Sequence, residues 1–442
     1  MRNFYTAFIL LILSVCTSMA QDTATAKAAD TACHCVKVTP PVPTFQNDHL
    51  YSSLSPLLSE CYDANEIQLD FDFHVNSNSI VTTFAGAFLT GKEITGTLKD
   101  RVAGYAPRLM KYEDEMKAGL AYKHYFKKPS VSLYVSYYHR NMRFLTTDRD
   151  AFELAFYGNK RFEDKTASLS NINFENLMYN QYSIGVSKSD GHFFGGVNVS
   201  FLQGFSDQQL KNPKGSLYTA PYGEYLDVAY SMTFNQANNG ASSFFDLDGK
   251  GFSADLQLGY SAENWRLSVT VQDLGYINWN RRPTNYVGDT ALRYNGIVIS
   301  DLTNLSGSGL AGLKLDSVFG VIGPKKSNNA YATNLPTIFQ VNYSRLVKLK
   351  KHSMILTASV NTRLLKNYYA YGYVKAAFVL DHDWTTSVSA GAGGYSLFNL
   401  GMDVGKRWRN LDFIIGSNNL IGSLLPMYFP GSSGYFRVAA HF

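Results

Sequence analysis

Charged side chains are scarce in this sequence. Asp, Glu, Lys and Arg make up 17% of its 442 residues, whereas soluble domains carry about 25% charged residues. No stretch after residue 20 is apolar over the roughly 20 residues that a membrane-spanning helix needs, which excludes a helical inner-membrane protein. The net charge of +5 is spread over short basic pairs, so no basic stripe indicates a nucleic-acid partner.

Cysteine is scarce as well. Of the four cysteines, Cys16 lies near the N-terminus, and Cys33, Cys35 and Cys61 follow. In an oxidising compartment a disulfide from Cys61 to Cys33 or to Cys35 is the simplest arrangement, and one thiol is then left over. A tetrahedral metal site on these cysteines and His34 is the alternative, but the Cys-x-Cys spacing is tighter than common zinc patterns. We expect no metal and no cofactor.

Aromatic residues and two-residue alternation are abundant. The chain has 30 Tyr and 29 Phe, many of them near the ends of segments in which apolar and polar residues alternate. Such alternation places apolar side chains on one face of a strand. It recurs at 67–75, 131–137, 226–234, 254–260, 265–272, 354–363 and 398–404.

A soluble β-sandwich could show the same alternation. However, the apolar face is sustained in nearly every strand, and the opposite face carries Asp, Arg, Asn and Gln, which suits a wet lumen. Only a closed sheet can span lipid, because an open edge leaves backbone groups unpaired. The sequence therefore predicts an all-β fold, a closed antiparallel transmembrane β-barrel.

The last eight residues alternate in the same way. One face carries Phe436, Val438, Ala440 and Phe442, and the other carries Tyr435, Arg437, Ala439 and His441. A chain that stops on an aromatic after such a strand resembles the closing strand of a bacterial outer-membrane barrel. We interpret Phe442 as a barrel-assembly signal. This interpretation implies a periplasmic C-terminus, with outer-membrane lipid and the barrel-assembly machinery as partners.

The N-terminus predicts export. Residues 1–20 combine Arg2, an apolar core over 8–13 and a small residue at Ala20, as in a secretory signal peptide. Residues 21–65 are rich in Ala and Thr and then in Pro, so we expect an extended N-terminal arm.

Residues 66–112 are expected to hold a first strand and a plug-like segment. Residues 66–75 could add a strand to the barrel wall, and Phe84 and Phe88 belong to a run with helical spacing. A short helix there would plug the barrel or line its mouth, and an ordinary extracellular loop is the alternative. Residues 113–442 then form the barrel.

Counting back from Phe442 gives about fourteen strands, an even number as in bacterial single-chain barrels. They lie near 434–442, 410–417, 397–405, 386–393, 369–380, 352–363, 337–347, 264–280, 251–260, 224–235, 192–203, 179–188, 130–146 and 113–126. On this count the connections 147–178 and 204–223 fall on the periplasmic side and are too long for it. Either the count slips there or these segments fold into the lumen.

Catalytic chemistry finds no support. The chain has nine histidines, but no spacing singles out a Ser–His or Asp–His pair that could activate a nucleophile. We expect no enzyme and name no catalytic residue.

Several segments resemble an uncharacterised family of Gram-negative outer-membrane barrels, from bacteria with type 9 secretion, that is distantly similar to FadL-type fatty-acid transporters. The resemblance implies fourteen strands and an N-terminal plug, and it supplies no binding residues. Its most specific part is a family-like turn with Asp273, Gly275 and Trp279, in which we interpret Trp279 as an interfacial aromatic anchor. The segments that carry it are 249–256, 267–280, 156–160 and 393–395.

Two functions follow from these observations. The FadL-like resemblance implies a barrel that passes small hydrophobic molecules across the outer membrane. The absence of a substrate signature suggests the alternative, a non-transporting structural or accessory subunit of an outer-membrane complex for secretion, motility or barrel assembly, with other outer-membrane proteins as partners. A polar-solute porin is a third reading. An apolar lumen with a wall opening favours transport, a lumen filled with salt-bridged side chains favours the accessory subunit, and a wet channel favours the porin.

Overall fold

The computed structural model describes residues 65–126, 131–190, 192–238, 248–262, 264–295, 323–349, 353–408 and 410–442. The expected signal peptide, the arm up to residue 64, and Cys33, Cys35 and Cys61 lie outside these residues and stay predictions. Within the described ranges no helix is long and apolar enough to cross a membrane. No group of three or more metal-ligating side chains gathers in them either.

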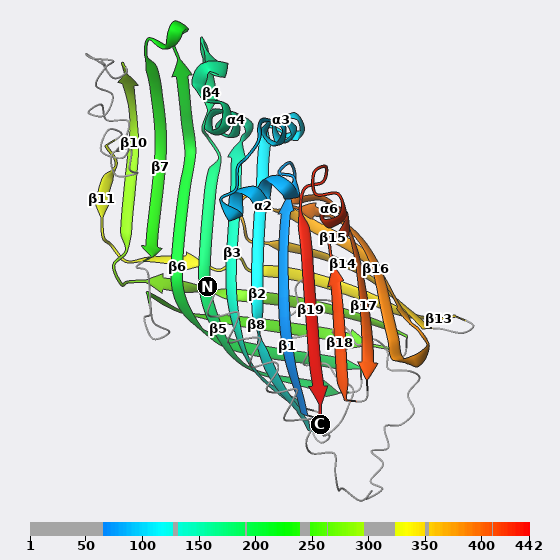
Figure 1. Ribbon diagram of the computed structural model, residues 1–442. Helices are drawn as coiled ribbons and strands as arrows, with labels where there is room; N and C mark the ends of the chain where they lie inside the picture. The colour runs from blue at the N-terminus through cyan, green and yellow to red at the C-terminus, as the bar shows by residue number, and fades with distance from the viewer. Residues whose placement is uncertain are drawn as a thin grey trace, which may run out of the picture. The chain divides into compact units, whose positions relative to one another are not determined.

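Fourteen antiparallel strands form a closed ring (Figure 1). The ring closes because β19 pairs with β1, from Glu66 opposite His441 to Val75 opposite Ser432. In order around the ring the strands are β1 (Asn65–Ser77), β2 (Leu109–Phe126), β3 (Val131–Asp148), β5 (Ile172–Asp190), β6 (Phe193–Thr219), β8 (Gly249–Ser261), β9 (Trp265–Trp279), β13 (Ile338–Lys348), β14 (Ser353–Arg363), β15 (Tyr369–Val379), β16 (Trp384–Gly394), β17 (Ser396–Trp408), β18 (Leu411–Ser417) and β19 (Ser432–His441).

The terminal strand has the two faces that its sequence predicts. Tyr435 and Arg437 point into the ring and are 5% and 8% exposed, whereas Phe436 and Val438, which alternate with them, are half-exposed on the outside. The backbone of Phe442 exchanges two hydrogen bonds with Asn65, and its side chain is exposed. The predicted closed β-barrel is confirmed.

The predicted number of strands is right, but one member of the count is wrong. Residues 224–235 are assigned to the wall by the sequence, whereas the structure places β7 (Leu226–Asn238) outside the ring. The place in the wall belongs to β1. The reason is the 27-residue length of β6, whose first half pairs with β8 and whose second half pairs with β7. The alternation of apolar and polar residues shows that β7 and β8 are strands. It does not show that both pair with the same edge of β6, one after the other along its length.

This correction also moves two long connections. With β7 removed from the wall, residues 149–171 and 220–225 both join strands at the end of the ring opposite Phe442. The slip in the count is therefore the right explanation for the connections 147–178 and 204–223. The end that carries Phe442 has the short connections, such as 262–264 and 349–352.

A projecting sheet continues the wall beyond the ring, away from Phe442 (Figure 1). The second half of β6 has β7 on one side and β4 (Lys165–Ser168) on the other. β10 (Thr284–Tyr294) pairs with β7, and β11 (Lys325–Ser327) pairs with β10. β12 (Tyr331–Asn334) pairs with the last residues of β9, beyond the part of β9 that pairs with β13, and so lies toward the same end. Short 3₁₀ turns lie at Asn159–Phe162 and Pro221–Gly223 at this end, and a third, Asp381–Asp383, joins β15 to β16 at the Phe442 end.

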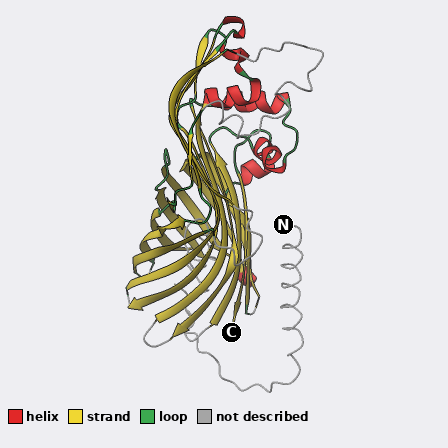
Figure 2. Cartoon of the chain, turned by 90° about the vertical axis from the view of Figure 1, so that its left-hand side faces the viewer, coloured by secondary structure: helices red, strands yellow, loops and turns green. Residues whose placement is uncertain are grey.

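Helices cover the rim at the same end. The predicted helical spacing appears as α2 (Thr82–Thr90), followed by α3 (Gly96–Tyr105). Both lie outside the ring of strands in the two views (Figures 1 and 2), so this segment flanks the mouth and does not plug the lumen. Phe84 and Val102 pack with Phe152 in one buried cluster. Two further helices are α4 (Arg149–Tyr157) and α6 (Leu420–Leu424).

The role of β1 as the closing strand is testable with one disulfide. Leu69 and Val438 are direct cross-strand neighbours, and such Cβ atoms lie about 4.5–5.5 Å apart. We expect Leu69→Cys/Val438→Cys, in a chain whose own cysteines are serine, to form an intramolecular disulfide on oxidation, detected as a gel shift. The matched pair Leu69→Cys/Val341→Cys, with the second residue on distant β13, should stay reduced. Absence of the first disulfide would contradict the closure.

Candidate functional site

Five buried charged side chains meet inside the ring. Arg140 donates to Glu115 at 2.7 Å and to both carboxylate oxygens of Asp273 at 2.8 and 2.7 Å. Arg363 donates to the other oxygen of Glu115 at 3.0 Å and lies 3.9 Å from Glu113. None of the five side chains is more than 8% exposed. We call this set the lumen network.

The lumen network joins opposite walls of the barrel. Glu115 lies on β2, the second strand of the ring, and Arg363 lies on β14, the ninth, so seven steps separate them in either direction. A round ring of fourteen strands, spaced about 4.8 Å and tilted about 40°, would be about 28 Å across. A Glu and an Arg side chain cannot bridge that width end to end. The ring is therefore flattened at this level, and charged side chains fill its centre.

A bulge in β9 aims Asp273 at Arg140. Asp273 has a positive φ of 55°, and the pairing with β8 shifts register between Ala254 and Leu256. The Asp273 N–H donates to the Asp255 carboxylate at 2.7 Å, and the Thr337 hydroxyl donates to the Asp273 carbonyl at 3.1 Å. Bulges re-aim side chains at functional sites, and this one is held by β8 on one side and by the residue that precedes β13 on the other.

Two of the four segments that carry the family resemblance, 249–256 and 267–280, lie side by side on β8 and β9. Gly249 lies opposite Trp279, and Ser253 lies opposite Gly275. A Cβ on Gly275 would lie 2.1 Å from the Phe252 carbonyl oxygen, so the close approach of β8 and β9 requires glycine there. The predicted turn at Asp273, Gly275 and Trp279 is wrong, because these residues lie within β9 and Asp273 forms a bulge.

Trp279 is also not an interfacial anchor. It is fully buried and packs inward over Gly204 and Gly249, where an added Cβ would lie 2.5 or 2.6 Å from its ring. Its Nε1 donates to the Thr333 hydroxyl at 2.9 Å. The interpretation failed because an aromatic residue at a strand end can face either the lipid or the lumen. Only Gly204 and Gly249, which leave room for the ring on the lumen side, indicate that Trp279 faces inward.

Above Trp279 two carboxyl groups lie buried at the base of the projecting sheet. The Thr333 hydroxyl donates to Asp207 at 2.8 Å and accepts from Gln209 at 2.6 Å. Burial raises the pKa of Asp207 to about 7. Burial, and next the charge of Asp207, raise the pKa of Glu175 to about 7. Both carboxyl groups therefore titrate near neutral pH.

The outer face of the ring carries two groups of aromatic residues. The pairing places Tyr137, Tyr182, Phe201, Phe252 and Tyr276 side by side on successive strands. We call this set the upper girdle. Nearer the other end, Phe193 contacts Tyr260, which contacts Trp265, which contacts Tyr343; these four are the lower girdle.

The spacing of the girdles fits a bilayer. Phe252 and Tyr260 lie eight residues apart on β8, about 27 Å along the strand and about 21 Å along a barrel axis tilted by 40°. Membrane barrels have an apolar band about 25 Å tall between their aromatic girdles. The outward residues between these girdles include Leu256, Leu258 and Val197, which are 45%, 57% and 42% exposed.

The sequence pattern missed the lumen network apart from Asp273. The alternation on β2 places Glu113 and Glu115 on the lumen face, and Arg140 and Arg363 also occupy inward positions. The sequence therefore indicates charged side chains in the lumen. It does not indicate which of them form ion pairs, because Glu115 and Arg363 are 248 residues apart.

Comparison with known proteins gives a family and several distant structural relatives. A family model described as "Family of unknown function (DUF5723)" matches residues 116–418. No curated protein matches the chain. Among solved structures, the Ralstonia pickettii toluene transporter TbuX is 10% identical, with 86% of this chain and 90% of that chain covered and a TM-score of 0.41.

Two further solved structures are similar at the same level. The Pseudomonas aeruginosa FadL homologue is 10% identical over 86% of this chain and 90% of that chain, with a TM-score of 0.39. The P. putida toluene transporter TodX is 8% identical over 88% and 93%, with a TM-score of 0.36. The predicted resemblance to an uncharacterised family is confirmed, and the link to type 9 secretion stays a prediction.

Removing Arg140 tests the lumen network. Arg140→Leu leaves Glu115 and Asp273 buried without their shared partner, and breaking a buried ion pair costs about 3–5 kcal/mol. We expect a clear fall in the free energy of unfolding, measured by urea titration in detergent micelles. The matched control is Arg293→Leu, whose ion pair with Asp227 is exposed and should matter little. Equal effects of the two variants would contradict a structural role for the network.

The buried carboxyl group of Asp207 predicts a pH dependence. The folded protein keeps its proton up to about pH 7, whereas the unfolded chain releases it near pH 4, so stability falls as pH rises through this window, by about 1.4 kcal/mol per pH unit. We expect a lower unfolding temperature at pH 8 than at pH 5, followed by circular dichroism, and a smaller difference in Asp207→Asn. Asp227→Asn is the control, because its exposed carboxyl group has a pKa lowered by the Arg293 hydrogen bond. An unchanged pH dependence in Asp207→Asn would refute this assignment.

Proposed function

The chain belongs to the DUF5723 family of unknown function, and we propose that it is a non-conducting barrel of the bacterial outer membrane that acts as a structural or accessory subunit of an outer-membrane complex. The observation that carries the proposal is the Glu115–Arg363 contact between opposite walls. A barrel whose centre is bridged by buried ion pairs offers no open route to a solute.

The outer face supports the membrane location. Large apolar side chains are exposed on both halves of the ring, for example Ile184 at 66% and Val374 at 60%, and a soluble protein would not leave so broad an apolar surface in water. The short connections lie at the Phe442 end and the long ones at the opposite end. Outer-membrane barrels have short periplasmic turns and longer extracellular loops, so we place Phe442 in the periplasm and the projecting sheet outside the cell.

Passage of small hydrophobic molecules is the competing proposal. An apolar layer favours it, because Phe144, Leu177, Tyr179 and Trp279 belong to one buried cluster inside the ring. The lumen network opposes it. Moving an apolar molecule past Glu115 and its partners would separate buried charges, at about 3–5 kcal/mol for each broken pair.

The projecting sheet supplies a surface for other outer-membrane proteins. Pairing aligns Leu145, Phe174, Leu210, Phe234 and Tyr286 on one face of five successive strands. Tyr286 at the end of the row is 9% exposed, and the other four side chains are partly exposed. A partly exposed apolar row on an extracellular extension is typical of a contact surface. We therefore propose partner proteins on this side of the membrane.

Conductance separates a filled lumen from a pore. In planar bilayers we expect the wild-type barrel to give no stable ion current, and Glu115→Ala/Arg363→Ala to give one, because the bridge across the lumen is gone. The matched control, Asp227→Ala/Arg293→Ala, removes an exposed ion pair from the projecting sheet and should stay silent. Heat-modifiable gel mobility checks that each variant is folded. A wild-type current, or saturable uptake of a small hydrophobic probe into vesicles, would overturn the proposal.

A further inference from the structure

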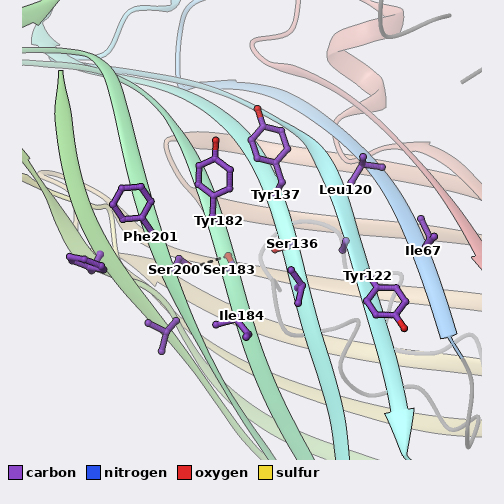
Figure 3. Close-up of a pocket in the computed structure, with 14 residues that line it drawn as sticks. Ile67, Leu120, Tyr122, Ser136, Tyr137, Tyr182, Ser183, Ile184, Ser200 and Phe201 are labelled. Carbon is purple, nitrogen blue, oxygen red and sulfur yellow. Dashed lines mark hydrogen bonds between the residues drawn. The ribbon is translucent and has the colours of Figure 1, made fainter. Parts of the chain in front are cut away.

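The outer wall is hollowed directly below the upper girdle. The hollow has a volume of about 670 Å³ and lies over β2, β3, β5 and β6 (Figure 3). Tyr137, Tyr182 and Phe201 form its upper edge. Its lower edge is formed by the next outward row, one step along the same strands, with Tyr122, Val135, Ile184 and Val199. We call this hollow the outer groove.

Small inward side chains explain the outer groove. Its floor is formed by Ala121, Ser136, Ser183 and Ser200, which are cross-strand neighbours in this order. All four are buried, and the hydroxyls of Ser183 and Ser200 are 2.9 Å apart. Because these side chains are small and lie between two rows of larger outward side chains, the outer surface is hollowed between the rows.

Polar side chains form the row directly above the upper girdle. His139, Asn180, Gln203 and Lys250 are cross-strand neighbours at the outward positions of successive strands. Asn180 and Gln203 are 2% and 4% exposed, His139 is half-buried, and Lys250 is exposed. The His139 ring nitrogen lies 2.9 Å from the Asn180 amide oxygen, and the Tyr182 hydroxyl donates to Gln203 at 2.9 Å. Lys250 lies two residues from Phe252 on the same face. We call this set the polar row.

We propose that the outer groove holds one acyl chain of a phosphate-bearing membrane lipid, with its head group at the polar row and its phosphate at Lys250. The inference rests on the proposed membrane location, since lipid must surround the wall. Volumes of about 300–1,000 Å³ suit small-molecule sites, each buried methylene adds about 0.8 kcal/mol, and a cation at head-group level attracts anionic lipid. A purely apolar occupant would make no use of the exposed positive charge of Lys250 at the edge of the groove.

Native mass spectrometry of the full chain in detergent tests this site with two probes, phosphatidylglycerol and a diacylglycerol with the same acyl chains. We expect the wild type to retain one phosphatidylglycerol per barrel and to retain diacylglycerol more weakly. Lys250→Gln should weaken phosphatidylglycerol retention about tenfold, a 1.4 kcal/mol change, and leave diacylglycerol unchanged. Val135→Trp/Val199→Trp should fill the groove and abolish retention of both probes.

The control places the same substitutions on the opposite wall. Val360→Trp/Val374→Trp changes two valines that are 55% and 60% exposed, compared with 50% and 51% for Val135 and Val199, and it should retain lipid like the wild type. Equal retention by the groove-filled variant, equal loss in the control, or no effect of Lys250→Gln would overturn the proposal. Failure of the wild type to insert into vesicles would instead refute the membrane location.

Discussion

The ion pair between Glu115 and Arg363 is the constraint on which the rest of the structure depends. Buried charges are tolerated only when each has its partner, and here the partners come from strands on opposite sides of the ring. Arg140 extends the bridge to Asp273. Fourteen strands would otherwise enclose a wide lumen. The network therefore requires a flattened barrel, and a flattened barrel with an ionic centre favours a structural role over conduction.

Outside and inside follow different rules in the same strands. The outward residues repeat apolar and aromatic types at the heights that a bilayer dictates, from the upper girdle at Tyr137 to the lower girdle at Trp265. The inward residues do not repeat one type. Each is determined by its own contacts, as in the bulge at Asp273, the space that Gly204 leaves for Trp279, and the buried carboxyl group of Asp207. This division explains why location can be assigned from general chemistry, whereas the function has to be argued from specific contacts.

The sequence predicted the outward half of the structure well, because alternation with a period of two determines which face is apolar. It gave the barrel, its closed form and the terminal strand before Phe442. It could not give the partners of inward residues, since strand pairing over long separations is invisible to a local pattern. Hence β7 was taken for a wall strand, Trp279 for an interfacial anchor, and Arg140 and Arg363 were not recognised.

The distance between the two walls tests the central claim most directly. Spin labels at outward-facing Met116 and Thr362, in a chain without other cysteines, flank Glu115 and Arg363 and leave the lumen network intact. Pulsed electron paramagnetic resonance in lipid should give a mean separation of roughly 28 Å or less, whereas outward labels on a round fourteen-strand ring of about that diameter would lie well beyond it. A separation well above that diameter would show that the walls do not meet and that the lumen is open.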